Sequence, residues 1–496
     1  MPLCEKEVIA LTPPTEAGTL NKPGIGVSGN SNIEDKEYFA KRSLKKGAVN
    51  WFLLMSLGIA YVISGDFSGW NYGIAYGGWV GMLIAFIVMG AMYLFMVFGL
   101  AEMSSAMPTA GAGYGFARRA LGKVGGALTG FAILMEYTIA PAAISLFISA
   151  YIQSLGLFAD VPTVAIIAVF FIIFVGIHLI GVGEALKVIF AITAVAFVAL
   201  IAFVVGMVPH FDVANLFNIP PTDGNSVMFP NGVSGVLAAL PFGIWLFLAV
   251  EGVPLAAEES TDPKRDMPKG IIGAMLTLVV TGALVVLLTA GGAGAAFAGA
   301  SDAPLVDCLN AVGESGIATF VNYLGLAGLI ASFFSIVYSN SRQAFALSRA
   351  GYLPKFLSLT GSRKTPYAAL IILGAIAFAL AAIIQDGATL LNIAVFAACV
   401  SYAMMNLSHI VLRKKEPNME RGFVVPGGVV LTSIAFVLSL VAIVSTFIVD
   451  AFAATCALVV LAALMVYFFV YSRHHLVGNA PEEEFEALKN AEQELN

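Results

Sequence analysis

Long apolar stretches follow one another along most of this chain, and short polar connections separate them. A helix that crosses the hydrocarbon core of a bilayer needs about 20 mostly apolar residues. Stretches of this length cover residues 48–76, 78–106, 125–155, 161–180, 186–208, 232–257, 270–292, 317–346, 367–385, 390–412, 427–449 and 451–471. They predict an all-α polytopic membrane protein of about twelve transmembrane helices.

The composition agrees with a chain that has the lipid bilayer as its solvent. Of 496 residues, 59% are hydrophobic and only 11% are charged, whereas a soluble protein carries about 25% charged residues. The sequence has no basic run with interleaved aromatic residues, so we expect no nucleic-acid partner. The four cysteines form no close pair and the five histidines are scattered, so we expect no metal, no cofactor and no catalytic residue.

The connections between the apolar stretches alternate in charge. Lys and Arg occupy residues 41–46, 118–123, 264–269, 349–364 and 413–421. The intervening connections, which include 209–231 and 293–316, carry Asp and Glu but no Lys or Arg. Because Lys and Arg accumulate in cytoplasmic loops, this pattern predicts a cytoplasmic (inner or plasma) membrane protein with both termini cytosolic. Residues 1–46 and the acidic residues 472–496 are then cytosolic tails.

Two of the predicted spans contain helix-breaking residues at membrane depth. The first contains residues 64–69 (SGDFSG), and the sixth contains Pro241 and Gly243 followed by an interruption at 251–254 (EGVP). Paired interruptions in corresponding spans are typical of inverted-repeat transporters, which bind substrate and ions at the unwound backbone near the bilayer midplane. We therefore expect two five-helix repeats, which we place at residues 47–208 and 232–412, and we place helices 11 and 12 within residues 427–471.

Four further motifs stand out in the sequence: residues 108–116 (PTAGAGYGF), 245–252 (WLFLAVEG), 257–268 (AEESTDPKRDMP) and 348–354 (SRAGYLP). They resemble motifs of a known family, the amino acid–polyamine–organocation permeases. The resemblance implies the five-plus-five inverted-repeat fold of leucine transporters, with two additional C-terminal helices. Within the family, residues 64–71 (SGDFSGWN) resemble the ethanolamine permease branch.

Asp66 gives the sharpest prediction about the substrate. Amino-acid members of the resembled family hold a substrate carboxylate at the unwound first helix, and an acidic side chain there would repel such a substrate. The same side chain would attract a small cation without a carboxylate, such as ethanolamine. The alternative is a kinked helix in which a neighbouring helix satisfies Asp66. By resemblance, Trp245 closes over the substrate, and its indole face can hold an ammonium group; a lipid-facing Trp245 is the alternative.

The remaining candidates complete a predicted site at the two interruptions. The substrate-binding set is Ser64, Gly65, Asp66, Phe67, Trp245, Phe247, Ala249 and Glu251. By resemblance, Glu251 handles protons, although it can equally cap freed N–H groups. Glu136 is a further acid for the cavity or for proton coupling. Lys187 supplies a fixed positive charge or reaches the interface as a snorkelling lysine. We expect H⁺ rather than Na⁺ as the coupling ion.

The predicted function is import of ethanolamine or a closely related small amine by alternating access. The nearest rival is an amino-acid permease of the same fold, working as a proton symporter or exchanger. A membrane-embedded receptor or enzyme is the rival from another class, and it lacks support because no nucleophile or metal constellation is present in the sequence.

Overall fold

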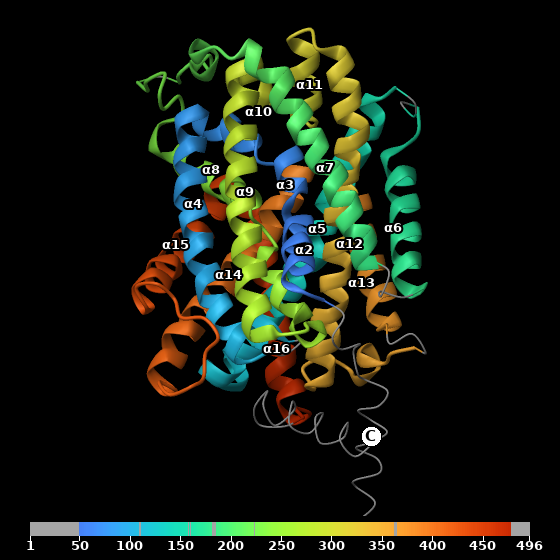
Figure 1. The fold of residues 1–496 in the computed structure, drawn as a ribbon, viewed down its shortest axis with the longest axis vertical. Helices are drawn as coiled ribbons and strands as arrows, with labels where there is room; N and C mark the ends of the chain where they lie inside the picture. The colour runs from blue at the N-terminus through green and yellow to red at the C-terminus, as the bar shows by residue number, and fades with distance from the viewer. Residues whose placement is uncertain are drawn as a thin grey trace, which may run out of the picture.

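Near-parallel helices form one bundle in the computed structural model, which describes residues 49–108, 111–156, 158, 160–180, 185–222, 224–361 and 365–477 (Figure 1). The α-helices are α2 (Trp51–Val62), α3 (Ser64–Phe67), α4 (Tyr72–Ala106), α5 (Ala112–Ser154), α6 (Thr163–Ile180), α7 (Ala185–Met207), α8 (Gly232–Trp245), α9 (Pro263–Ala293), α10 (Ala295–Gly299), α11 (Pro304–Ala311), α12 (Ser315–Arg349), α13 (Tyr367–Ile384), α14 (Gly387–Lys415), α15 (Val429–Val449) and α16 (Ala451–Val470). The 3-10 helices are η1 (Val208–His210), η2 (Val213–Phe217), η3 (Val250–Glu259), η4 (Lys355–Ser358) and η5 (Ser472–His474).

The span count agrees with the sequence. Among the described residues, 11 helices are long and apolar enough to cross a membrane, and the shorter apolar segment Trp51–Phe67 lies before them. The prediction of an all-α polytopic membrane protein is therefore confirmed. The first 46 residues and the acidic tail beyond residue 477 lie outside the described residues.

Two span boundaries differ from the prediction. Tyr72, which we expected near the end of the first span, begins α4, and α5 begins at Ala112 rather than near residue 125. Each of these helices contains one glycine at positive φ, Gly78 at 69° and Gly122 at 80°. Glycine adopts this conformation without the cost of a Cβ clash. A short helical turn can therefore precede the main helix and approach it from another direction.

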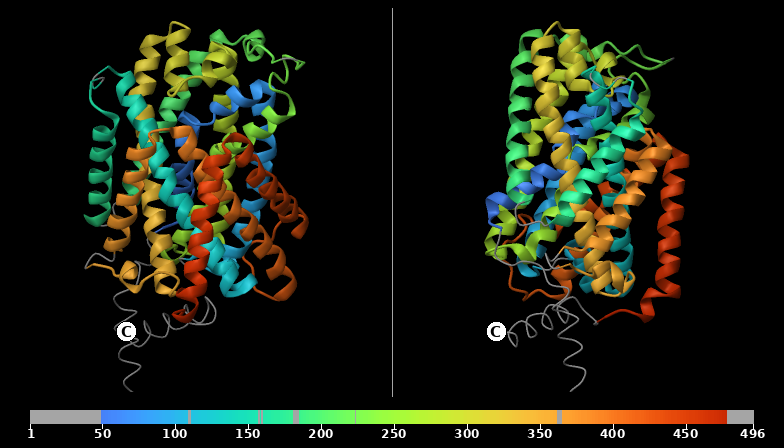
Figure 2. Two further views of the ribbon diagram at one scale, coloured as in Figure 1. Left: turned by 180° about the vertical axis from the view of Figure 1, so that it is seen from behind. Right: turned by 90° about the vertical axis from the view of Figure 1, so that its right-hand side faces the viewer.

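Helices from the first half of the chain pack against helices from the second half. Among the extensive helix contacts, α4 packs on α8 and α2 packs on α9, which join the second span to the sixth and the first to the seventh. Likewise α5 packs on α14 and α7 packs on α12, which join the third span to the tenth and the fifth to the eighth. If five is added to each span number, with ten subtracted from any sum above ten, spans 2 and 6 become spans 7 and 1. In the same way, spans 3 and 10 become spans 8 and 5. Two five-helix repeats related by symmetry would produce this relation. The C-terminal α16 runs along the outside of the bundle (Figure 2).

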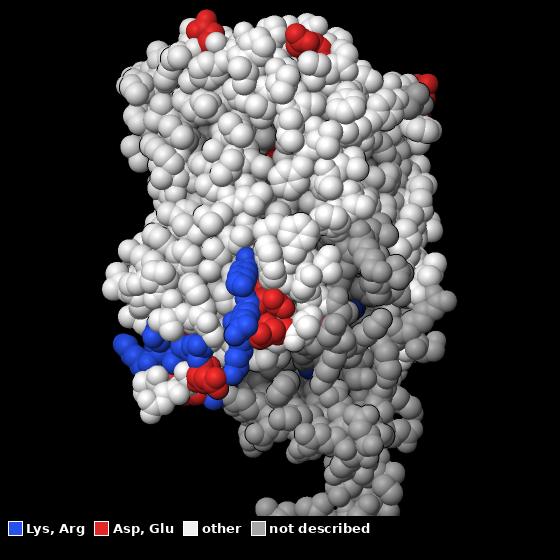
Figure 3. Space-filling view, in the orientation of Figure 1, with Lys and Arg blue, Asp and Glu red and all other residues white. Residues whose placement is uncertain are grey.

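Charge divides the bundle into two ends (Figure 3). The described Lys and Arg side chains belong to the end that includes the α9 start and the α14 C-terminus, which we call the basic end. The opposite end, which carries α10 and α11, is the acidic end. Its carboxylates include Asp212, Asp302, Asp386 and Asp450. The band between the two ends is almost free of charge in Figure 3, as a lipid-facing surface requires.

Candidate functional site

The first span is interrupted where α2 gives way to α3. The Ser332 hydroxyl of α12 bridges this point: it donates to the Ala60 carbonyl at 2.7 Å and accepts from the Ser64 N–H at 2.9 Å. A backbone group freed at membrane depth needs such a partner, because lipid offers none. After Phe67 the chain becomes extended at Ser68, with φ −162° and ψ 161°. The sequence therefore placed this interruption correctly.

The second interruption lies earlier than we expected. The α-helix α8 ends at Trp245, and the chain resumes as the 3-10 helix η3 only at Val250. The break is thus at residues 246–249, whereas the prediction placed it at 251–254. Ala249 has φ 79°, a left-handed conformation that ends a regular helix and is costly for a residue with a Cβ. Pro254, which lacks an N–H, is accommodated within η3.

The two interruptions touch each other at Trp245. A Cβ added at Gly65 would lie 2.7 Å from the Trp245 carbonyl oxygen, and one at Gly69 would lie 2.5 Å from Trp245 Nε1. Only glycine permits this approach, which explains the two glycines of the SGDFSG segment. Trp245 Nε1 donates to the Ser68 carbonyl at 2.9 Å. With 3% of its surface exposed, Trp245 is a buried residue of this crossing and not a lipid-facing one.

Asp66 is buried on α3, with 1% of its surface exposed. Its carboxylate lies against α9, because a Cβ added at Gly282 would be 3.6 Å from Asp66 Oδ1. Thr281 also faces it, but the Thr281 hydroxyl donates to two carbonyls of its own helix, each at 3.3 Å. In the described part of the chain, neither Asp66 carboxylate oxygen has a hydrogen-bond partner. A buried carboxylate without a partner is costly, so this position has unused capacity for a cation.

The two phenylalanines of the predicted site pack into neighbouring helices. Phe67 fills the space left by Gly325 and Gly328 of α12, where an added Cβ would approach its ring to 2.8 and 2.5 Å. Phe247 contacts Phe86 and Tyr93 of α4, with ring centroids 5.6 Å apart in both pairs. These contacts hold α3, which carries Asp66, and the segment that follows Trp245.

Two acids from different spans lie next to each other in the interior of the bundle. Glu136 of α5 and Glu251 of η3 are both buried, and their carboxyl groups lie close enough to interact directly. Tyr137 donates its hydroxyl to Glu251 Oε1 at 3.0 Å, and Tyr402 donates to Glu136 Oε1 at 3.1 Å. The second oxygen of each carboxyl has no hydrogen-bond partner among the described residues. We call these two residues the acid pair.

The tyrosines around the acid pair were missed by sequence reasoning. Tyr93 of α4 donates its hydroxyl to that of Tyr402 of α14 at 2.7 Å, which extends the network of α5, η3 and α14 to a fourth helix. The signal available in the sequence was a tyrosine in the middle of each of three apolar spans. A buried Tyr usually finds a hydrogen-bond partner, so such positions mark polar networks even when the partners are unknown.

Hydrogen bonds and ion pairs join several segments at the basic end of the bundle. Glu259 Oε1 of η3 accepts from Tyr338 at 2.7 Å and pairs with Arg342 of α12 at 3.1 Å. The Glu259 carbonyl also accepts from the Val49 N–H at 3.1 Å, which ties the start of the first span to the sixth. On the other side, Glu102 pairs with both Arg413 and Arg421 at 2.8 Å.

Two further polar residues belong to α7 and α12. Lys187 belongs to α7, but its side chain lies outside the described residues. Ser335 on α12 is buried, and its hydroxyl has no partner among the described residues. Ser332, in contrast, is used in the first interruption, as described above.

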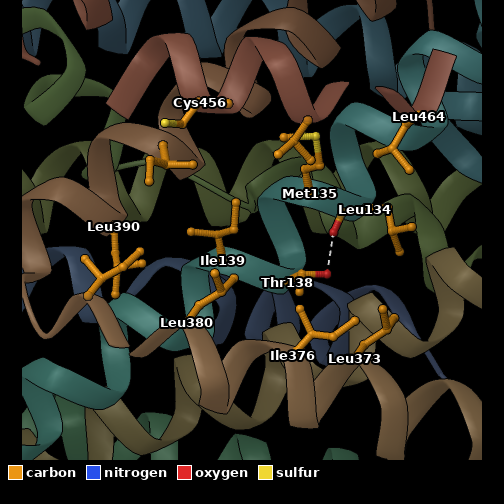
Figure 4. A pocket seen from close by; sticks show the side chains of 14 residues that line it. Leu134, Met135, Thr138, Ile139, Leu373, Ile376, Leu380, Leu390, Cys456 and Leu464 are labelled. Carbon is orange, nitrogen blue, oxygen red and sulfur yellow. Dashed lines mark hydrogen bonds between the residues drawn. The ribbon is translucent and has the colours of Figure 1, made fainter. Parts of the chain in front are cut away.

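A separate apolar pocket of about 400 Å³ lies between α5, α13, α14 and α16 (Figure 4). Its lining is Leu134, Met135, Thr138, Ile139, Leu373, Ile376, Leu380, Ile384, Leu390, Ile393, Cys456, Ala457, Val460 and Leu464. The Thr138 hydroxyl donates to the Leu134 carbonyl at 2.7 Å and is therefore satisfied within its own helix. No charged side chain lines the pocket, so it does not suit a charged substrate.

The amino acid permease family model matches residues 53–478. The chain belongs to the amino acid permease family. The match places this permease in the amino acid–polyamine–organocation superfamily and confirms the resemblance of its motifs. Because the members of this family are transporters, the chain is a multi-pass membrane transporter rather than an enzyme.

The names of the relatives of this permease refer to different substrates. The branched-chain amino acid permease of Bacillus subtilis (strain 168) is 28% identical to this permease over 464 residues, which cover 88% of this chain and 95% of that protein. The methylthioribose transporter of the same organism is 28% identical over 393 residues, or 76% and 83% of the two chains. The aromatic amino acid transport protein of Escherichia coli O6:H1 is 26% identical over 361 residues, or 69% and 76%.

Proposed function

We propose that this permease imports ethanolamine or a closely related small amine, in symport with protons. The observation that carries the proposal is the buried, unpartnered carboxylate of Asp66 at the first interruption. A substrate with its own carboxylate would meet electrostatic repulsion there, whereas an ammonium group would neutralise the acid. Trp245 lies at the crossing of the two interruptions, and its indole ring would bind the same cation.

The acid pair supports proton coupling. Two carboxyl groups that are desolvated side by side cannot both be ionised without a large cost. The pair therefore holds a proton that it can release when the geometry of the unwound sixth span changes. Glu251 lies on that unwound span and Glu136 on the intact α5, so a movement of η3 relative to α5 alters the distance between the two acids. Release of this proton to the cytosol requires the Glu259–Arg342 ion pair to break.

The second candidate is an amino-acid permease of the same fold. The observation in its favour is that two of the relatives described above are named for amino acids. In that case the Asp66 carboxyl would be neutral and satisfied by α9.

A competition assay tests the choice between these substrates. The purified protein is reconstituted into proteoliposomes, and uptake of labelled ethanolamine is measured against a panel of unlabelled compounds. We expect ethanolamine and small primary amines to compete, and alanine, leucine and phenylalanine to leave uptake unchanged. A protein that takes up labelled leucine and ignores ethanolamine is an amino-acid permease.

We further propose that the basic end faces the cytosol, because Lys and Arg concentrate on that side. Single cysteines at Met228 of the acidic end and Arg265 of the basic end report this orientation in intact cells, with the native cysteines replaced by serine. The two native side chains are exposed. We expect an impermeant thiol reagent to label Met228→Cys at once, and Arg265→Cys only after the cells are permeabilised. Equal labelling before permeabilisation contradicts this orientation.

A further inference from the structure

A hollow of about 190 Å³ opens at the acidic end of the bundle. It lies between the ends of α4, α5 and α14 and the connection that precedes α11. Its lining includes two carboxylates, Asp302 and Asp386, and two aromatic rings, Tyr72 and Phe147. No Lys or Arg is among its lining residues.

Both carboxylates of the hollow are held in place. Asp302 Oδ1 accepts from the Tyr72 hydroxyl at 2.8 Å. Asp386 Oδ1 accepts from the Ala388 N–H at 3.1 Å, which caps the start of α14. Asp386 Oδ2 accepts from the Thr389 hydroxyl at 2.5 Å, and both acids line the same hollow. A small cation in that space would interact with two carboxylates and with the faces of aromatic rings.

A buried hydroxyl adds a second kind of recognition. Ser149 of α5 lines the same hollow and has only 1% of its surface exposed. Its Oγ has no hydrogen-bond partner among the described residues. A polar group buried without a partner is costly, and a ligand hydroxyl would satisfy it. An ammonium group with a hydroxyl on the adjacent carbon matches this combination of carboxylates and serine.

The hollow adjoins the crossing of the two interruptions. Phe147, which lines the hollow, packs edge-on against Trp245, with ring centroids 6.0 Å apart. The Ser68 hydroxyl donates to the Asp302 carbonyl at 2.9 Å, so the loop that carries Asp302 is bonded to the first interruption. A ligand in the hollow is therefore separated from the inner site by the Phe147–Trp245 contact.

We propose that this hollow is an outer binding site, in which a small amino alcohol cation rests before it passes Phe147 and Trp245. The proposal rests on the proposed function and deepens it, because it assigns substrate selection to residues remote from Asp66. Asp302 and Asp386 attract the ammonium group, and Ser149 binds the hydroxyl.

Protection of a cysteine in the hollow tests the proposal without measuring transport. Gln153 lines the hollow, and Gln153→Cys is made in a protein whose native cysteines are replaced by serine. An uncharged thiol reagent is used, so that changes of protein charge leave its own access unaltered. We expect ethanolamine to slow the labelling, and ethylene glycol, which lacks the ammonium group, to have no effect at the same concentration.

Three further variants, each combined with Gln153→Cys, identify the residues through which ethanolamine slows the labelling. Asn retains one acceptor oxygen for Tyr72 and for the α14 cap, so the double variant Asp302→Asn, Asp386→Asn removes both charges and, besides them, the oxygen that accepts from Thr389. We expect it to raise the half-protecting ethanolamine concentration about three- to tenfold, as exposed charge pairs do. Asp212→Asn, at another cap of the acidic end, leaves it unchanged. Ser149→Ala weakens protection by ethanolamine more than protection by ethylamine.

Asp66→Asn separates the outer site from the inner one. We expect undiminished protection in this variant, because the hollow does not contain Asp66. Loss of protection in Asp66→Asn, or equal protection in the double variant, overturns the outer site. So does an absence of protection in the parent protein. Protection without ethanolamine uptake by the parent protein contradicts the proposed function and leaves the outer site standing, whereas uptake without protection does the reverse.

Discussion

The variant Asp66→Asn is expected to bind ethanolamine tens to thousands of times more weakly than the parent protein. Asn keeps the size of the side chain and most of its hydrogen-bonding capacity but removes the charge. Removing one partner of a desolvated charge pair typically costs about 2 to 5 kcal/mol. Because Asp66 is buried and its oxygens have no partner among the described residues, the substrate ammonium would be its counter-charge. Equilibrium binding of labelled ethanolamine to the purified variant measures the effect.

The control for Asp66→Asn is a change on the other side of the same contact. Thr281→Val removes the α9 hydroxyl that faces Asp66 and changes no charge. The hydrogen bonds lost are those of Thr281 to carbonyls of its own helix, so we expect the ethanolamine affinity to stay within about threefold of the parent value. If Asp66 serves only to hold α3 against α9, Asp66→Asn instead lowers the yield of folded protein while the surviving protein binds normally. Normal affinity of Asp66→Asn for ethanolamine would favour the amino-acid permease over the amine importer.

The second large effect is expected at the acid pair. Glu251→Gln and Glu136→Gln should each abolish accumulation driven by a pH gradient while retaining substrate binding and counterflow. Each substitution leaves a single carboxyl beside a neutral amide, so the repulsion between two carboxylates that makes the pair hold a proton is lost. Uptake into proteoliposomes with an imposed pH gradient, compared with counterflow at equal pH, measures the two activities separately.

Tyr402→Phe is the matched control for the acid pair. It removes the hydroxyl that donates to Glu136 Oε1 at 3.1 Å but leaves both carboxyl groups in place. We expect this variant to accumulate substrate under a pH gradient at a reduced rate. Accumulation that persists in Glu251→Gln removes Glu251 from the proton path, and loss of counterflow together with accumulation assigns it a structural role.

Much of the architecture was predictable from the sequence. Span length and Lys/Arg placement depend on the thickness and polarity of the bilayer, which act on each stretch of chain separately. The interruption at residues 64–69 was equally local, because Ser, Gly and Asp together are poor helix formers. The sixth interruption was found but misplaced, because the left-handed Ala249 that ends the helix is held by its surroundings and has no signature in its own residue type.

The partners of the buried polar groups were decided only by the tertiary structure. Glu136 and Glu251 were recognised singly as acids at membrane depth, but their pairing depends on how α5 packs beside η3. The direction of Asp66 toward α9, and the convergence of Asp302 and Asp386 around Tyr72, likewise join distant segments. A sequence shows that an acid is costly in a membrane because that cost belongs to the residue itself. Which group offsets the cost depends on the positions of other helices, and only the folded chain fixes these.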